Sequence, residues 1–197
     1  RVIENGKTVA YRLTGEKFFI TNSAKHDGEF LCSMLVVIAR IVDRPEELQD
    51  PQAAKRYGAF IVETHWPGCS VIRLRFEGVR GIYNGVPTFN NIYVPIENLL
   101  GNEEDGLRIA LATLTVGRLT LPAASSGGLK QCLSVMRWWG RTRVQWNKPI
   151  GEHTLIGEKL CRAAAYTLAL DAVMAYCGAW ANKKGDLRLE SAAAKII

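Results

Sequence analysis

The alternation of apolar and polar positions changes near residue 100, and this change divides the chain into two parts. Before it, short stretches rich in β-branched and aromatic residues are separated by glycine-containing turns, which predicts strands. The polar stretch 43–55 carries two prolines and is interpreted as a surface loop between paired strands. The predicted strands cover residues 9–13, 17–21, 33–40, 59–63, 70–74 and 88–94.

After residue 100 the apolar residues recur at helical spacing. An acidic run opens a helix predicted over 103–139, where its charge complements the helix dipole. Pro122 interrupts this pattern, so we expect a bend near Thr120. A second helix is predicted over 152–182 because the segment is dense in alanine and leucine. A third helix is predicted to begin near residue 186 and to continue at Ile197.

Together these patterns predict an α+β fold. A small antiparallel β-barrel or sandwich-like domain over residues 1–100 is followed by an up-and-down helical bundle over 101–197. The apolar faces of the helices need at least one more partner, and the first residues read like the middle of a domain. We therefore expect an incomplete bundle and a longer parent protein.

Composition narrows the class of protein. The longest uninterrupted apolar runs are far shorter than the roughly 20 residues of a bilayer-spanning helix, which predicts no membrane span. Five scattered cysteines argue against a disulfide framework or a zinc cluster and favour a reducing compartment. The net charge of +6 lies mostly after residue 100, where 13 basic residues face 8 acidic ones. Phosphorylated cofactors, acyl carriers and nucleic acid would all suit this surplus.

Two stretches carry residues suited to binding chemistry. In the first, Phe19 offers a ring edge to a flat ligand, and the Thr21 hydroxyl can bond to a ring heteroatom. In the second, Arg143 can clamp a pyrophosphate through a charge-assisted fork, and Trp146 can stack on a planar group. Each stretch alone has an ordinary alternative, a half-buried strand or a solvated helix end.

Three motifs in order resemble the acyl-CoA dehydrogenase family of FAD flavoproteins. They are F-I-T-N at 19–22, V-P-x-E-N-L-L-G at 94–101 and R-x-x-W-N-K-P-I-G-E-H-x-L-I at 143–156. The resemblance covers nearly the whole chain, from a middle β domain into the first helices of a C-terminal domain. It implies α,β-dehydrogenation of an acyl-CoA thioester, in which a carboxylate removes the α-proton and flavin N5 receives hydride.

The resemblance also implies the cofactor contacts. The strand motif flanks the flavin and bonds to N5 through its hydroxyl, whereas the Arg143 motif binds the FAD pyrophosphate of a neighbouring subunit. The flavin site would then lie across a dimer interface. The implied FAD contacts are Phe19, Ile20, Thr21, Arg143, Gln145, Trp146, His153 and Thr154.

On the substrate side, the resemblance points to Thr115 and Arg118 as contacts of the acyl-CoA. A minority of the family carries the catalytic base one residue before this arginine. That position is Gly117, which cannot act as a base, so we expect the base beyond Ile197. In the loop 78–84, the family's arginine and glycine are present but its hydroxyl residues are missing.

The implied partners are a second copy of the chain, as a homodimer or homotetramer, and an electron-transfer flavoprotein. We expect the cytoplasm of a bacterium or the mitochondrial matrix of a eukaryote. Two alternatives stay open. One is an acyl-CoA oxidase-like relative, and the other is a flavoprotein of the same fold that binds nucleic acid and has lost dehydrogenation. The second is weakened because the basic residues form no arginine- or lysine-rich run.

Overall fold

A computed structural model describes residues 1–50, 55–78, 80–183 and 185–196. The chain divides into two compact units, Arg1–Ala110 and Leu111–Ile197. Unit 1 holds the two larger β-sheets, and unit 2 holds most of the helical part and a two-stranded hairpin.

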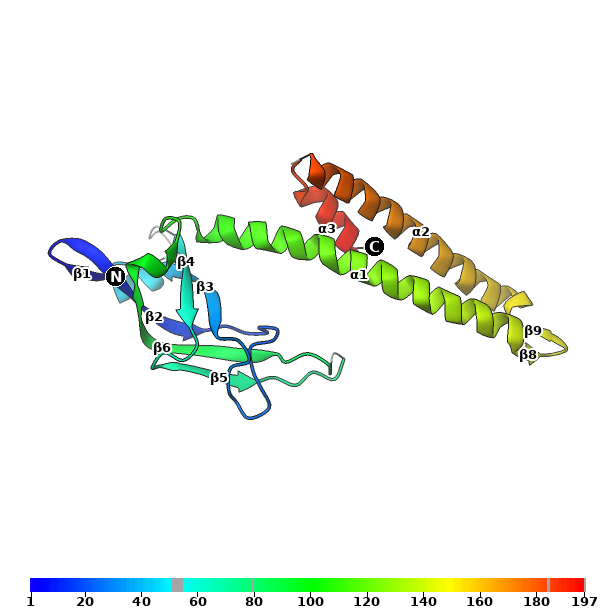
Figure 1. Ribbon diagram of the computed structural model, residues 1–197, viewed down its shortest axis with the longest axis horizontal. Helices are drawn as coiled ribbons and strands as arrows, with labels where there is room; N and C mark the ends of the chain where they lie inside the picture. The colour runs from blue at the N-terminus through cyan, green and yellow to red at the C-terminus, as the bar shows by residue number, and fades with distance from the viewer. Residues whose placement is uncertain (51–54, 79, 184, 197) are drawn as a thin grey trace. The chain divides into compact units, whose positions relative to one another are not determined.

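Unit 1 contains two antiparallel sheets (Figure 1). The first has four strands in the order β1-β2-β6-β5, and the second has three in the order β3-β4-β7. The described strands form two separate sheets rather than one closed barrel, so the sandwich-like form of the prediction is the correct one. The bounds are β1 Val2–Glu4, β2 Lys7–Glu16, β3 Met34–Ile41, β4 Arg56–Glu63, β5 Cys69–Arg73, β6 Gly85–Pro95 and β7 Leu99–Leu100.

The core of unit 1 gathers apolar residues from both sheets. Ile92 and Val94 alternate along β6 with exposed neighbours, which is the period-2 pattern of a strand with one buried face. Tyr11 and Phe60 meet edge to face, with ring centroids 4.9 Å apart. The cluster comprises Tyr11, Leu13, Val37, Ile41, Phe60, Val62, Phe89, Ile92 and Val94.

Five of the six predicted strands are present, and the strand predicted over 17–21 is wrong. In that segment only Ile20 makes a bridge, to Gly85. Phe19 has φ 58° and Asn22 has φ 57°, both in the left-handed region, so the chain cannot stay extended. The loop predicted over 43–55 does join paired strands. It contains the short 3-10 helix η1 Pro45–Leu48, and its residues 51–54 lie outside the described part.

The first long helix is α1 Gly106–Thr142, so the predicted start at residue 103 was wrong. The acidic run precedes the helix because its side chains have other partners. Asp105 accepts hydrogen bonds from the backbone of Asn102 and from Arg108, and Glu103 pairs with Arg1. The helix continues unbroken through Pro122, and the bend near Thr120 stays a prediction.

A glycine allows α1 to begin where it does. A Cβ at Gly106 would lie 2.5 Å from the Tyr57 carbonyl oxygen and 2.6 Å from the Gly58 carbonyl carbon. Only glycine permits this close approach of the helix start to β4. Upstream, β6 leads into α1 through the 3-10 helix η2 Ile96–Asn98 and β7.

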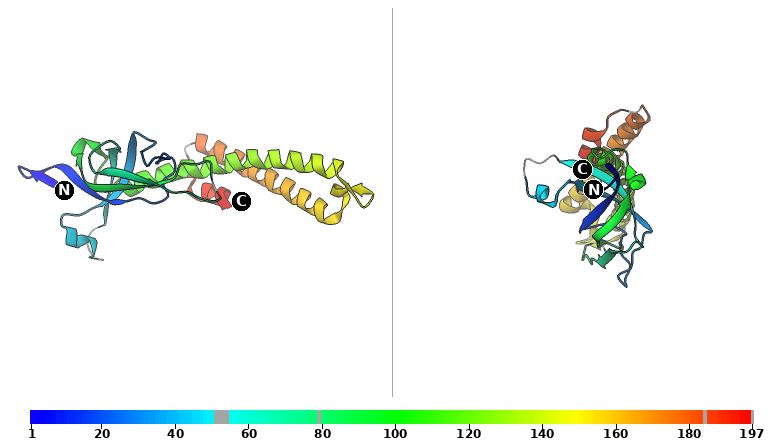
Figure 2. Two further views of the ribbon diagram at one scale, coloured as in Figure 1. Left: turned by 90° about the horizontal axis from the view of Figure 1, so that it is seen from below. Right: turned by 90° about the vertical axis from the view of Figure 1, so that its left-hand side faces the viewer.

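In unit 2, α1 and α2 Thr154–Asn182 run side by side, as Figure 1 and the left view of Figure 2 both show. Asp171 on α2 accepts a hydrogen bond from Ser126 and pairs with Lys130 at 2.8 Å, both on α1. The short helix α3 Arg188–Ile196 contributes buried Ser191 and Ala194. The prediction of an up-and-down helical arrangement is confirmed, while the predicted state of Ile197 lies outside the described residues.

By length and composition α1 and α2 could each cross a membrane. Each contains an 18-residue stretch of mean hydropathy 1.2, of which 6% and 17% respectively is buried. This is weak evidence, since helices of a soluble bundle also carry such stretches. The absence of a membrane span, inferred from uninterrupted apolar runs, therefore stays a prediction.

Candidate functional site

The segment that follows β2 holds an aromatic side chain in a strained, open position. Phe19 is 65% exposed. Its backbone is left-handed, a conformation that costs a non-glycine residue roughly 1 kcal/mol or more. Its ring contacts Phe18 and Phe76, with centroids 6.0 and 5.7 Å away. Strain of this kind is typical of functional sites, and here it accompanies an exposed ring.

A bridge to β6 holds this segment in place. The Ile20 amide donates to the Gly85 carbonyl at 3.1 Å, and the Gly85 amide donates back at 3.0 Å. The fully buried Ser23 donates from its hydroxyl to the Ile20 carbonyl at 2.8 Å. Both polar groups of the Ile20 backbone are therefore satisfied, and the side chains on either side of it are fixed.

Thr21 is the third residue of the F-I-T-N motif at 19–22. Its side chain is exposed, and its hydroxyl has no hydrogen-bond partner among the described residues. A free hydroxyl beside an exposed ring fits a flat ligand with a heteroatom at its edge. The structure thus brings Phe19, Ile20 and Thr21 together in unit 1, in a turn rather than in the predicted strand.

The connection between α1 and α2 is a tight hairpin. Strands β8 Val144–Gln145 and β9 Lys148–Pro149 pair antiparallel around a two-residue turn. Both turn residues have positive φ, 49° at Trp146 and 62° at Asn147. This geometry suits Asn-Gly far better than a tryptophan, so the indole occupies an unfavourable position.

Trp146 is also 83% exposed. Its only described ring contact is with His153, edge to face at 5.3 Å between centroids. His153 also reaches the Gln145 carbonyl through Nε2 at 3.2 Å, so the hairpin and the start of α2 form one local cluster. The indole face is therefore open to a ligand.

Arg143 and Thr154 flank this cluster, one just before β8 and the other at the first position of α2. Both are exposed, and no carboxylate of the described residues pairs with Arg143. The Arg143 carbonyl accepts a hydrogen bond from Ile150 at 2.8 Å, which anchors its backbone. An anchored arginine without a counter-charge suits a phosphate group.

The residues expected on the substrate side lie on α1 in unit 2. The Thr115 hydroxyl donates to the Leu111 carbonyl at 3.0 Å, which is local helix bonding rather than a sign of a ligand. Arg118 is half-buried. A Cβ at Gly117 would meet no described atom within 4 Å.

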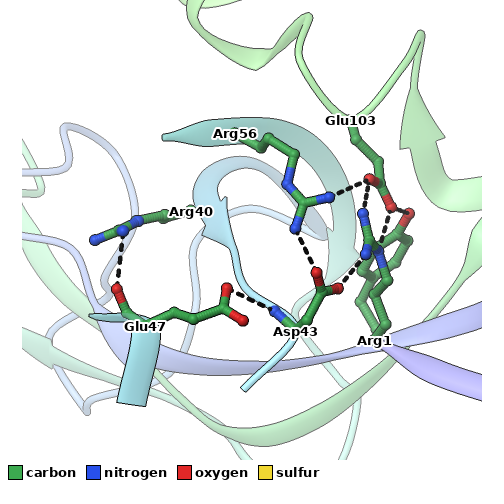
Figure 3. A network of polar contacts seen from close by, with 7 residues as sticks. Arg1, Arg40, Asp43, Glu47, Arg56 and Glu103 are labelled. Carbon is green, nitrogen blue, oxygen red and sulfur yellow. Dashed lines mark hydrogen bonds and ion pairs between the residues drawn. The ribbon is translucent and has the colours of Figure 1, made fainter. Parts of the chain in front are cut away.

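Unit 1 also contains an ion-pair network that the sequence did not suggest (Figure 3). Arg1 donates from Nε to Glu103 Oε1 at 2.8 Å and also pairs with Asp43, which Arg56 reaches at 2.9 Å. The Tyr11 hydroxyl donates to the same Glu103 oxygen at 2.8 Å. The network links the residue before β1, strands β2 and β4, the loop after β3 and the segment before α1.

The electrostatics of this network favour the charged form of Glu103. The hydrogen bond from Arg1 holds the pKa of Glu103 below its ordinary value, and the bond from Tyr11 adds to that effect. Burial raises the pKa of Tyr11 to about 12, with further help from Glu103. The ionised Glu103 carboxylate therefore has its partners within the network, and its contacts with Arg1 and Tyr11 stabilise this part of unit 1.

Comparison with known proteins gives a consistent result. Residues 104–197 match the family model described as acyl-CoA dehydrogenase, C-terminal domain. The probable acyl-CoA dehydrogenase FadE10 of Mycobacterium tuberculosis is 41% identical over 199 residues, covering 98% of this chain and 28% of the relative. The chain belongs to the acyl-CoA dehydrogenase family. It spans little more than a quarter of the length of this relative.

Solved structures of the family agree. The butyryl-CoA dehydrogenase of Megasphaera elsdenii superposes with a TM-score of 0.79 at 25% identity, over 94% of this chain and 45% of that one. An acyl-CoA dehydrogenase of Bacillus anthracis, solved in complex with FAD, gives 0.70 at 30% identity, over 84% and 26%. The suspected family and the α+β fold are thereby confirmed.

The exposed groups described above fit the family's cofactor. FAD offers an aromatic ring system with heteroatoms and a pyrophosphate, which match Phe19 and Thr21 in unit 1 and Arg143 and Trp146 in unit 2. Sequence reasoning missed Gly85 and Ser23, which hold the first pair in place. Gly85 lies just before the strand predicted over 88–94, so the sequence pattern did not mark it, and its close approach to Ser23 and Ala24 appears only in the folded chain.

Proposed function

We propose that the intact protein is an FAD-dependent acyl-CoA dehydrogenase. The observation that carries this proposal is the 41% identity to a probable acyl-CoA dehydrogenase along 98% of this chain. The exposed Phe19–Thr21 turn and Arg143–Trp146 hairpin add local support. When bound, the flavin supplies the redox chemistry by accepting hydride from the β-carbon of the acyl group.

In this proposal the residues of this chain bind and orient the FAD. Phe19 packs its ring against the flavin, and Thr21 donates its hydroxyl to the flavin edge. Arg143 pairs with the pyrophosphate, while Trp146 stacks on a neighbouring planar group, with His153 and Gln145 fixing the hairpin. Ile20 holds the turn through its bridge to Gly85, and Thr154 would contact the same FAD molecule as Arg143.

We further propose that the two halves of the site serve different flavins. In a homodimer or homotetramer, the turn in unit 1 would contact the flavin of its own chain and the hairpin that of a partner. Arg118 and Thr115 would contact the acyl-CoA. Gly117 carries no acid, so the carboxylate that removes the α-proton is left to another part of the protein.

A product assay tests this function. The intact protein is incubated with straight and branched acyl-CoA thioesters and an artificial electron acceptor, and products are analysed by mass spectrometry. We expect a 2,3-enoyl-CoA, lighter than its substrate by two hydrogen atoms. Absence of this product for every chain length, in a preparation that retains its flavin, would rule the dehydrogenase out.

The same preparation separates the oxidase alternative. After reduction by substrate, the flavin of a dehydrogenase is reoxidised slowly by oxygen and rapidly by an electron-transfer flavoprotein. An oxidase would show rapid reoxidation by oxygen with formation of hydrogen peroxide. Salt-sensitive binding of duplex DNA without any enoyl product would favour the nucleic-acid-binding relative.

A further inference from the structure

Unit 1 contains a basic cavity that the proposed flavin and substrate contacts do not use. Its volume is about 540 Å³, which lies within the range of about 300–1,000 Å³ that is typical of small-molecule sites. It lies where β5 ends and the following loop begins. The lining residues are His26, Arg73, Leu74, Arg75, Phe76, Glu77, Arg80 and Ile82.

The charges around this cavity are unbalanced. Three arginines line it, and Glu77 is the one carboxylate among its described lining residues. None of the three arginines forms an ion pair with a described carboxylate. Arg80 donates from Nε to the Glu77 backbone carbonyl at 3.3 Å, which leaves its outer nitrogens free.

Arg73 is the clearest case of an arginine without a counter-charge in this cavity. Its guanidinium carbon lies 4.7 Å from the centroid of the Tyr83 ring, and one of its outer nitrogens contacts His26 Nδ1. Its Nε is buried and has no hydrogen-bond partner in the described part of the chain. A partly buried cation held only by a ring face and a histidine lacks the counter-charge that normally offsets its desolvation.

The ion-pair network in the same unit provides a contrast. Arg56 also has a buried Nε without a partner, but its outer nitrogens reach Asp43 and Glu103 at 2.9 and 3.9 Å. That arginine is neutralised within the protein. Arg73 is not, so its missing counter-charge points to a ligand.

We infer that this cavity binds the phosphate group of a small organic ligand. The arginine forks of Arg73 and Arg75 match the tetrahedral oxygens of a phosphate, which accept two parallel hydrogen bonds from one guanidinium. Apolar walls from Leu74, Phe76 and Ile82 suit the organic part of such a ligand. Phosphate binding here can be measured whether or not the protein is a dehydrogenase.

The test is calorimetric titration of the intact flavoprotein with inorganic pyrophosphate at low ionic strength, where screening is weak. Wild type is expected to bind. Arg73→Gln and, separately, the exposed Arg75→Gln are each expected to weaken binding about tenfold, the loss of one charged hydrogen bond. The Arg75 variant keeps the test valid if the Arg73 variant fails to fold.

Arg12→Gln is the matched control. The Arg12 guanidinium carbon lies 5.3 Å from the centroid of the Tyr93 ring. The substitution therefore removes the same charge and the same kind of ring contact elsewhere in unit 1. This variant should bind pyrophosphate as the wild type does. Failure of the wild type to bind, or equal weakening in the control, would overturn the inference.

Competition identifies the source of the phosphate. Displacement of pyrophosphate by coenzyme A but not by 3′-dephospho-coenzyme A would assign the cavity to the 3′-phosphate of the thioester substrate. Failure of both to displace it would assign the cavity to a separate phosphorylated ligand. Either result upholds a phosphate site, because both require that wild type binds and the arginine variants bind weakly.

Discussion

Gly85 is the position at which one added methyl group should damage the Phe19–Thr21 turn. It lies at the start of β6 and exchanges two backbone hydrogen bonds with Ile20, one residue after Phe19. A Cβ built on it would lie 2.6 Å from Ser23 Oγ, 2.7 Å from Ala24 Cβ and 2.9 Å from a Val71 methyl carbon. All three contacts are closer than normal packing allows.

The expected cost follows from these contacts. Ser23 and Ala24 are fully buried, and neither is a flexible side chain that could move aside. Overpacking of this kind costs about 1–3 kcal/mol, against which the lower backbone entropy of alanine returns roughly 0.4–1 kcal/mol. We therefore expect Gly85→Ala to lower the free energy of unfolding by about 1–2 kcal/mol and to weaken FAD retention.

The assay compares urea unfolding midpoints and flavin content of the intact protein. Gly81→Ala is the control, because a Cβ there meets no described atom within 4 Å. It should keep the wild-type midpoint and flavin content. The reasoning is refuted if Gly85→Ala unfolds at the same urea concentration as the control and retains the same amount of FAD.

Three further changes test other parts of the structure. Tyr11→Phe removes the hydrogen bond to Glu103 and should lower the free energy of unfolding by about 1 kcal/mol near neutral pH. Because the folded pKa of about 12 exceeds the unfolded value of about 10, wild type should lose the stability that Tyr11 contributes as pH rises from 10 to 12. A Tyr11→Phe protein with the same alkaline loss in urea midpoint would contradict this. Gly185→Ala would drive a methyl group into the Trp180 indole, so we expect the free energy of unfolding in urea to fall by about 1–3 kcal/mol. An unchanged urea midpoint would count against this contact. Trp146→Ala should change the free energy of unfolding by less than about 0.5 kcal/mol, since the indole is 83% exposed, yet lower the FAD retained after gel filtration. Wild-type FAD content in that variant would exclude the stacking role.

Much of the fold could be predicted because local pattern and tertiary packing agree. In β6, apolar residues alternate toward the core, and the sequence period alone identifies the strand. The segment 17–21 shows where this fails. Its composition favours a strand, but the bridge to Gly85 imposes a left-handed Phe19, which no propensity of phenylalanine predicts.

The start of α1 predicted at residue 103 was wrong for a related reason. The acidic run looked like a first helical turn, yet Glu103 is drawn into the pair with Arg1, a residue 102 positions earlier in the chain. Such long-range partners leave no local signal. The proposed cofactor contacts rest on motif order, whereas the arginines of the basic cavity come together only in the folded chain.

The central claim is that a flavin bound by this protein oxidises acyl-CoA thioesters. The most direct test is anaerobic titration of the purified intact protein with acyl-CoA of varied chain length, while the absorbance of the oxidised flavin is recorded. We predict that at least one thioester bleaches this absorbance. The account would be contradicted if dithionite reduces the bound flavin but none of the acyl-CoA thioesters bleaches its absorbance.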